Sequence, residues 1–272
     1  MHRSQIADLI LARLENESDR LVSDFSLPGR IPSCQIQHLL PSDLVGRIHQ
    51  AFPPSERMIF KRSIKESKHI AAQMDQYDPL LEEIVYAFQD ERVVDAVARI
   101  TGLAMLEPDA DLYAGGISAM SKGAYLRPHL DNSHDKDRQR YRVLNLLFYV
   151  TPDWQESYGG SLQLWDEGPR GAARTLPSLF NSLVIMITDR TSWHSVNEVR
   201  HDGRRCCVSN YYFSRRSPGE EDYSHATSFR AEHGRGLADV TMRADNMLRT
   251  TILRSIGGQF WRNPHVYRRE MD

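Results

Sequence analysis

The chain has 272 residues, of which 40% are hydrophobic and 26% are charged, and its formal net charge is −2. This composition is typical of a soluble globular protein, and the near-neutral charge argues against a nucleic-acid partner. No segment approaches the run of about 20 apolar residues that a membrane-spanning helix needs, so we expect no membrane partner either. The length allows one large domain or one domain with extensions.

The cysteines and the N-terminus predict a cytoplasmic protein. Cys206 and Cys207 are adjacent and rarely bridge each other, and Cys34 alone makes no disulfide framework. This usage is typical of a reducing compartment. Residues 1–25 carry charges between their apolar positions and lack the continuous apolar core of a signal peptide.

Residues 1–104 are expected to form an N-terminal helical lead-in and supporting region. Pro28-Gly29 and Pro53-Pro54 end the first two predicted helices, and Gly102 caps the third. The predicted elements are helices over 4–25, 42–52 and 79–101 and a short strand over 36–40.

Residues 105–217 are expected to form a β core. Short apolar runs alternate here with Gly, Pro and Asp, and many short strands at regular spacing are typical of a sandwich or a jelly-roll barrel. The candidate strands are 116–120, 124–130, 142–150, 161–165, 182–187, 193–199 and 205–213. The fold class predicted is mainly β with helical extensions (α+β).

Residues 218–272 are expected to form a C-terminal helical extension. Residues 237–256 have apolar side chains at helical spacing, and Gly257-Gly258 ends the pattern. We expect this helix to pack against the core, with a lid or a dimer element as the alternative. A homodimer could form through the terminal helices. The three regions are expected to make one structural domain overall.

The pattern that points most directly to chemistry is His129-Leu130-Asp131, followed by His194 and Arg205. Side chains i and i+2 of a strand share a face, so His129 and Asp131 can point into one cavity that His194 closes from a facing sheet. Two imidazoles and one carboxylate are ligands of non-haem Fe(II), and an arginine can clamp a carboxylate bidentately. A surface His and Asp is the alternative for the His-x-Asp pair alone.

Seven segments carry a family resemblance through their order and spacing. They are Gly123 to Asn132, Arg142 to Val150, Asp153-Trp154, Tyr158 to Trp165, His194 to Val196, Gly203 to Cys207, and Tyr211 to Phe213. Together they resemble the 2-oxoglutarate- and Fe(II)-dependent dioxygenases, in particular the prolyl-4-hydroxylase-like branch. The resemblance covers about residues 105–215, and residues 36–104 are similar to the family's lead-in. The first 30 residues and everything after 217 lie outside it.

The resemblance implies a double-stranded β-helix, a cupin-like jelly roll with iron at its open end. It carries the metal-ligand roles onto His129, Asp131 and His194. It also implies Fe(II) as cofactor, 2-oxoglutarate and O2 as cosubstrates, and ascorbate as an accessory reductant.

The distal carboxylate of 2-oxoglutarate needs a buried cation, and Arg204 and Arg205 compete for that role because strand neighbours face opposite ways. Arg205 is preferred, since it lies eleven residues after His194, a spacing common in the family. Arg204 then faces solvent. Cys207 stands where the family often has a serine, so that hydroxyl is missing here.

Roles for five further residues rest on the resemblance or on position. Tyr149 is expected to bond the distal carboxylate, with a core aromatic as the alternative, and Asn145 to lie near the iron end, with a strand-edge amide as the alternative. The candidates for the substrate wall are Tyr125, Trp193 and Tyr211, with core packing as the alternative for each.

The implied reaction hydroxylates an aliphatic C–H bond while 2-oxoglutarate and O2 become succinate and CO2, with no catalytic residue beyond the metal ligands. Asp131 argues against halogenation, because related halogenases replace this carboxylate. We expect a small-molecule substrate, an amino acid or a tailored metabolite. Hydroxylation of a protein or peptide side chain, desaturation and cyclisation are the alternatives. A non-catalytic sensor and a zinc hydrolase are disfavoured, because the cosubstrate residues Arg205 and Tyr149 are present.

Overall fold

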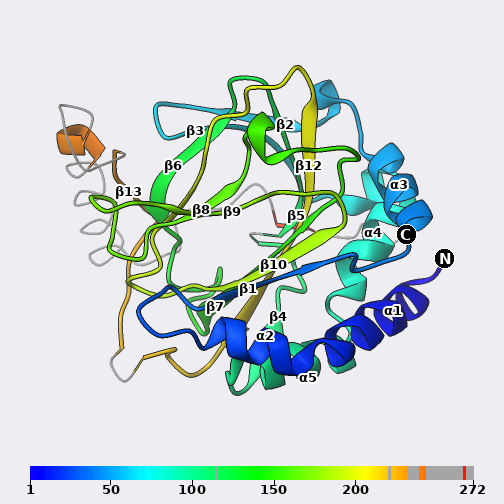
Figure 1. Cartoon of the computed structure of the whole chain (residues 1–272), viewed down its shortest axis with the longest axis horizontal. Helices are drawn as coiled ribbons and strands as arrows, with labels where there is room; N and C mark the ends of the chain where they lie inside the picture. The colour runs from blue at the N-terminus through cyan, green and yellow to red at the C-terminus, as the bar shows by residue number, and fades with distance from the viewer. Residues whose placement is uncertain (114, 220–221, 232–238, 243–265, 268–272) are drawn as a thin grey trace.

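The computed structural model describes residues 1–113, 115–219, 222–231, 239–242 and 266–267, and shows an antiparallel sheet, nearly closed into a barrel, with helices along one flank (Figure 1). The strands are β1 (Ser33–Gln37), β2 (Ile59–Arg62), β3 (Glu66–Ala71), β4 (Leu106–Pro108), β5 (Gly116–Ser121), β6 (Tyr125–Leu130), β7 (Tyr141–Tyr149), β8 (Leu162–Leu164), β9 (Arg174–Leu176), β10 (Ser182–Ile187), β11 (His194–Val196), β12 (Arg204–Ser214) and β13 (Ser228–Phe229).

The strands follow the order β1-β10-β7-β12-β5-β3-β6-β11-β8-β9, while β2 pairs with β3, β4 with β12 and β13 with β6. This nearly closed jelly roll confirms the predicted double-stranded β-helix. Each strand predicted between residues 105 and 217 is present, β10 with the predicted bounds and the others with shifted ends, and the strand predicted over 36–40 lies at Ser33–Gln37. Strands β2, β3, β4, β9 and β13 were not predicted.

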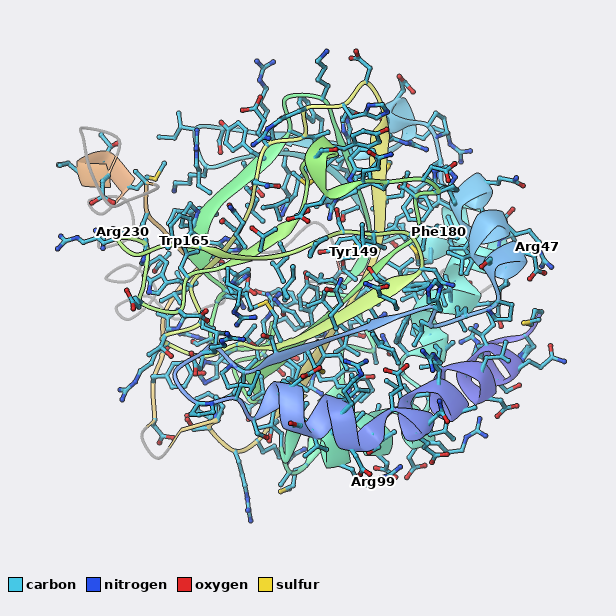
Figure 2. All side chains as sticks on the ribbon, viewed as in Figure 1. Arg47, Arg99, Tyr149, Trp165, Phe180 and Arg230 are labelled. Carbon is cyan, nitrogen blue, oxygen red and sulfur yellow. The ribbon has the colours of Figure 1, made fainter. Side chains whose placement is uncertain are left out.

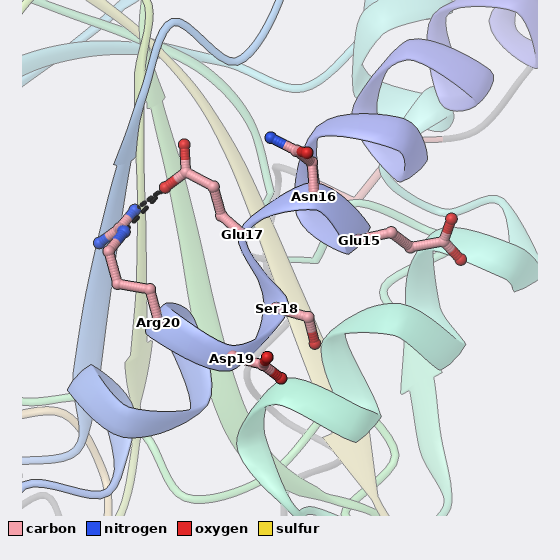
Figure 3. A pocket seen from close by; sticks show the side chains of 6 residues that line it. All are labelled: Glu15, Asn16, Glu17, Ser18, Asp19 and Arg20. Carbon is pink, nitrogen blue, oxygen red and sulfur yellow. Dashed lines mark hydrogen bonds and ion pairs between the residues drawn. The ribbon is translucent and has the colours of Figure 1, made fainter.

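Five α-helices lie wholly within the described residues, α1 (Arg3–Asn16), α2 (Ser18–Phe25), α3 (Ser42–Ala51), α4 (Pro79–Ala87) and α5 (Glu91–Thr101). The helix predicted over 4–25 breaks at Glu17, where a shallow surface pocket is lined by residues 15–20 and Arg20 pairs with Glu17 (Figure 3). The helix predicted over 79–101 also divides in two, because the side chain of Asp90 accepts a hydrogen bond from the backbone N–H of Arg92 and starts α5. Gly102 ends α5 with φ 69°, as predicted.

The helices bury their apolar stripes in the main hydrophobic core. Ile6, Ile10 and Leu14 of α1 are fully buried, and each such side chain contributes about 1.5–3 kcal/mol to folding. Tyr149 lies in the middle of the molecule, whereas Arg47 and Arg99 lie at its periphery (Figure 2). The hydrophobic core is therefore built partly from helices that lie outside the barrel.

The C-terminal helix predicted over 237–256 lies outside the described residues, except that residues 239–242 are helical. None of the helices in the described part of the chain combines the length and apolar content that crossing a bilayer requires.

Candidate metal centre and cosubstrate pocket

Two histidines and one aspartate meet where β6 and β11 pair. His129 and His194 are direct cross-strand partners whose ring centroids lie 4.1 Å apart, and Asp131 follows the end of β6. Nε2 of His129 lies 3.5 Å from Oδ1 of Asp131, and Nε2 of His194 lies 3.4 Å from Oδ2. The three potential ligand atoms lie within 4.8 Å of one another, a set of donors that suits non-haem iron.

Backbone carbonyls fix the orientation of both imidazoles. Nδ1 of His129 lies 2.9 Å from the carbonyl oxygen of Arg127, and Nδ1 of His194 lies 2.9 Å from that of Ser192. Each Nδ1–H can donate to its carbonyl, which leaves Nε2 as a free lone pair directed at Asp131. Burial, and then the neighbouring His194, lower the pKa of His129 and favour the neutral form that binds a metal.

A second layer of polar side chains holds Asp131. Nδ2 of Asn145 donates to Oδ2 of Asp131 at 2.8 Å, and Nη2 of Arg142 lies 3.0 Å from the same oxygen. Arg142 also donates to Oδ1 of Asn145 from Nε at 3.1 Å, and its guanidinium lies 3.7 Å from the ring centroid of Tyr211. Burial alone would raise the pKa of Asp131, but Arg142 and His194 outweigh it and hold the pKa well below its usual range. The carboxylate is therefore ionised and oriented.

A bulge in β7 changes the face on which Arg142 lies, so the sequence did not predict a role for this residue. Leu144 lies opposite Tyr212 and Arg142 lies opposite Phe213, so Val143 is an extra residue in β7. This bulge turns Arg142 to the same face as Asn145, although the two are three residues apart.

The barrel interior beside the cluster is formed by facing residues of β7 and β12. Three cross-strand pairs line it, namely Asn145 with Tyr211, Leu147 with Ser209, and Tyr149 with Cys207. The side chains of Arg205, Cys207, Ser209 and Tyr211 share this face by alternation. This face, which we take as the wall of the cosubstrate pocket, runs from Asn145, beside Asp131, toward Arg205.

Arg205 and Tyr149 lie together at the far end of this face, with buried polar atoms that have no partner. The guanidinium of Arg205 is 5.1 Å from the ring centroid of Tyr149. Nε of Arg205 and the hydroxyl of Tyr149 are both buried without a hydrogen-bond partner, and no carboxylate of the described residues pairs with Arg205. Such a cation is costly to bury alone. Because burial also raises the pKa of Tyr149 and keeps its hydroxyl neutral, the two groups fit a ligand carboxylate.

Gly160 shapes this end of the pocket. A Cβ built on it would lie 3.0 Å from Cδ of Arg205 and 3.0 Å from Cγ2 of Val199, and its φ is +71°. The backbone can therefore approach Arg205 closely only because residue 160 has no side chain.

Arg204 points the other way. Its Nη1 donates to the carbonyl oxygen of Pro53 at 2.5 Å, so it is half-buried against the loop after α3 rather than facing solvent as predicted. Cys207 lies in the pocket wall with its Sγ 3.7 Å from Oγ of Ser209. The family often has a serine at the position of Cys207. In this chain the hydroxyl belongs to Ser209, two residues further along the same face of β12.

The three residues predicted for the substrate wall lie in different surroundings. Val196 is opposite Leu126 while His194 is opposite His129, so β6 carries one extra residue between them, and Leu126 rather than Tyr125 shares the face of His129. The hydroxyl of Tyr125 donates to the carbonyl oxygen of Ser63 at 3.0 Å. Trp193 is half-buried just before β11.

Tyr211 is the member of this set that contacts the cluster's second layer, through Arg142. Burial raises its pKa to about 12, and Arg142 opposes that shift. The tyrosine is therefore neutral, with its ring against a cation.

A residue beyond the recognised motifs also contacts a candidate ligand. Phe229 of β13 pairs with His129, and the two rings stack with centroids 5.2 Å apart. Ser133 anchors the same segment, because its backbone N–H donates to the carbonyl oxygen of His225 at 3.1 Å. The sequence offered no signal for this contact, since β13 has two residues and follows a polar break.

Comparisons with known proteins agree with this geometry. Residues 115–213 match the family model of the 2OG-Fe(II) oxygenase superfamily. Prolyl 3-hydroxylase OGFOD1 of Xenopus laevis is 37% identical over 84 residues, which are 29% of this chain and 16% of that protein. A prolyl-4-hydroxylase of Pseudomonas putida has a similar structure, with a TM-score of 0.53 and 20% identity over 73% of this chain and 100% of that one.

The epimerase SnoN from nogalamycin biosynthesis has a TM-score of 0.56 and 12% identity over 83% of this chain and 87% of that one. These structural likenesses show the fold, and the family model covers the segment that holds His129, Asp131, His194 and Arg205. Residues 115–213 therefore form a 2OG-Fe(II) oxygenase domain, the domain of an oxidoreductase, and the chain is similar to prolyl hydroxylases in this segment and in its fold.

Proposed function

We propose that this protein is an Fe(II)- and 2-oxoglutarate-dependent dioxygenase that hydroxylates an aliphatic C–H bond of a small molecule, with 2-oxoglutarate and O2 converted to succinate and CO2. The observation that carries the proposal is the buried cluster of two Nε2 atoms and one carboxylate within 4.8 Å. Residues 105–217 form the catalytic core in this proposal, residues 1–104 support it, and residues 218–272 extend it.

His129, Asp131 and His194 would hold the metal, which supplies the oxidising chemistry when bound. The protein's part is coordination and orientation. Arg127 and Ser192 fix the imidazoles through their carbonyls, while Arg142 and Asn145 fix the carboxylate. Asp131, as an ionised carboxylate, would coordinate the metal, so the site would lack the open ligand position that halogenation needs for a halide.

Arg205 and Tyr149 would bind the distal carboxylate of 2-oxoglutarate. Two buried polar atoms without partners, one on a cation and one on a neutral hydroxyl, support this role. A charge-assisted pair with a carboxylate would satisfy both. Asn145, at the other end of the same face, would lie near the metal-chelating end of the cosubstrate.

The segment around Phe229 favours a small substrate. It lies outside the family-model match, pairs with β6 and stacks a ring on His129, so it covers one side of this imidazole. The second candidate is hydroxylation of a protein or peptide side chain. The name of the Xenopus laevis relative, a prolyl 3-hydroxylase, favours it.

Succinate formation tests the proposal. The protein with Fe(II), 2-oxoglutarate and O2 should release succinate, with stimulation by a member of a panel of amino acids, metabolites and proline-containing peptides. His129→Ala should abolish the release, whereas Lys122→Met, a change at an exposed lysine, should not. Stimulation by peptides and never by metabolites would select the second candidate, and no succinate from folded, iron-loaded protein would refute both.

A further inference from the structure

One face of the hairpin formed by β2 and β3 turns toward the barrel interior. Ile70 of β3 lies opposite Ser118 of β5, and Ser118 lies opposite Cys207, which belongs to the pocket wall. Directly opposed residues share a face of a sheet, so Ile70 faces the interior, and Lys68 and Glu66 face it by alternation.

Two lysines oppose each other on this interior face. Lys61 of β2 lies directly opposite Lys68 of β3, and like charges in such positions destabilise a sheet. Nζ of Lys68 lies 3.0 Å from a carboxylate oxygen of Glu66. Lys61 is half-buried and makes no hydrogen bond or ion pair with any residue that the structure describes. The single negative charge of Glu66 therefore lies beside the two ammonium groups of Lys61 and Lys68, so the net charge of these three residues is positive.

This pair lies next to the metal cluster. Glu66 is opposite Leu126, which shares its face with His129 because of the extra residue in β6. At the tip of the hairpin, Nζ of Lys65 lies 5.3 Å from the ring centroid of Phe229, the ring that stacks on His129. The two lysines thus lie on β2 and β3, beside the strand that carries His129.

We propose that Lys61 and Lys68 bind an oxyanion of the substrate, a carboxylate or a phosphate, so that the substrate of this site is anionic. The inference rests on the proposed function and adds the chemical class of the substrate to it. An oxyanion between the two ammonium groups accepts charge-assisted hydrogen bonds from both and removes their repulsion. Glu66 keeps Lys68 in place when no anion is bound.

Calorimetric titration with inorganic phosphate, and separately with acetate, tests the site in protein loaded with Mn(II) and saturated with 2-oxoglutarate. Lys61→Met and Lys68→Met should each weaken binding of the preferred anion by about tenfold or more, the effect of a loss of about 1.4 kcal/mol. Lys61→Arg should keep most of the binding. Lys122→Met is the matched control, because Lys122 is 58% exposed and pairs with Asp202.

The paramagnetic Mn(II) should also speed the relaxation of bound phosphate, which would place it near the metal. Tighter binding of phosphate than of acetate would assign a phosphorylated substrate, and the reverse a carboxylic acid. Absence of binding to the parent protein, or equal affinities in Lys61→Met and Lys122→Met, would overturn the site. Calorimetry needs neither oxygen nor turnover, so a protein that forms succinate but binds neither anion refutes the anion site alone. A protein that binds phosphate but forms no succinate refutes the oxygenase proposal and leaves a bare anion site.

Discussion

Nη2 of Arg142 lies 3.0 Å from Oδ2 of Asp131, the same oxygen that lies 3.4 Å from Nε2 of His194. Asn145 donates to this oxygen as well, at 2.8 Å. Two donors therefore fix the carboxylate plane before any metal binds. Ligands held by such outer hydrogen bonds bind metals more tightly than free ones, so the affinity of the cluster depends on a residue that is not a ligand.

Arg142→Met should lower the affinity for Mn(II) or Fe(II) by about 10–100-fold, the usual effect of losing an outer-layer partner of a ligand. Arg142→Lys should recover part of the loss, because it restores a charge but not the two-point contact. Metal titration of the apo-protein measures both. Arg215→Met is the control, since Arg215 is 71% exposed and pairs with Glu107. Equal metal affinity in Arg142→Met and the parent would contradict the account.

Arg205→Ala should raise the KM for 2-oxoglutarate by roughly 30-fold or more, because truncating one member of a buried charge pair costs about 2–5 kcal/mol. Arg204→Ala should change it little, since Arg204 bonds the carbonyl oxygen of Pro53 on the other face. Initial rates of succinate formation at varied 2-oxoglutarate concentration decide between them. A raised KM in Arg204→Ala with little change in Arg205→Ala would instead assign binding of the distal carboxylate to Arg204.

Gly160→Ala should raise the KM for 2-oxoglutarate as well, because the added Cβ would meet Cδ of Arg205 at 3.0 Å. Gly123→Ala is a matched control. Gly123 has a similar φ of +79°, but a Cβ added there would have nothing within 4 Å of it. Both changes should cost about 1–2 kcal/mol of stability through the positive φ, but only Gly160→Ala should weaken cosubstrate binding. A shift in KM for both variants would point to backbone strain instead.

The metal-free protein should become less stable as the pH falls from about 7.5 to about 5.5. Burial is the leading cause that lowers the pKa of His49, His69, His129 and His225. The unfolded chain takes up these protons near its ordinary histidine pKa of about 6.5, before the folded protein does. The unfolded state therefore gains protons first and the free energy of unfolding decreases. Urea denaturation at the two pH values measures this, and an equal or greater stability at the lower pH would be inconsistent with buried neutral imidazoles.

The barrel strands and the metal cluster could be predicted because they rest on local patterns. Alternation marked β7, β10 and β12, and His129-Leu130-Asp131 is a short motif on one strand. The division of residues 79–101 into two helices was missed, because the apolar spacing continues across the break. Asp90 was the available signal, since a residue of this type often caps a helix.

The second layer could not be predicted, because it depends on bulges. Alternation fails at Val143 and again between Leu126 and His129, so the faces of Arg142 and Tyr125 cannot be deduced from counting. The β2–β3 hairpin has exposed Ile59 and Phe60 among its charges, which hides the two-residue period of a half-buried strand.

Anaerobic addition of Fe(II) and 2-oxoglutarate to the metal-free protein tests the central claim most directly. Chelation of the cosubstrate at an iron held by His129, Asp131 and His194 should produce a weak visible charge-transfer band. The band should be absent in His129→Ala and should need more 2-oxoglutarate in Arg205→Ala, while Arg204→Ala should resemble the parent. No band in folded parent protein, or an unchanged band in His129→Ala, would contradict the assignment of this cluster as the iron site.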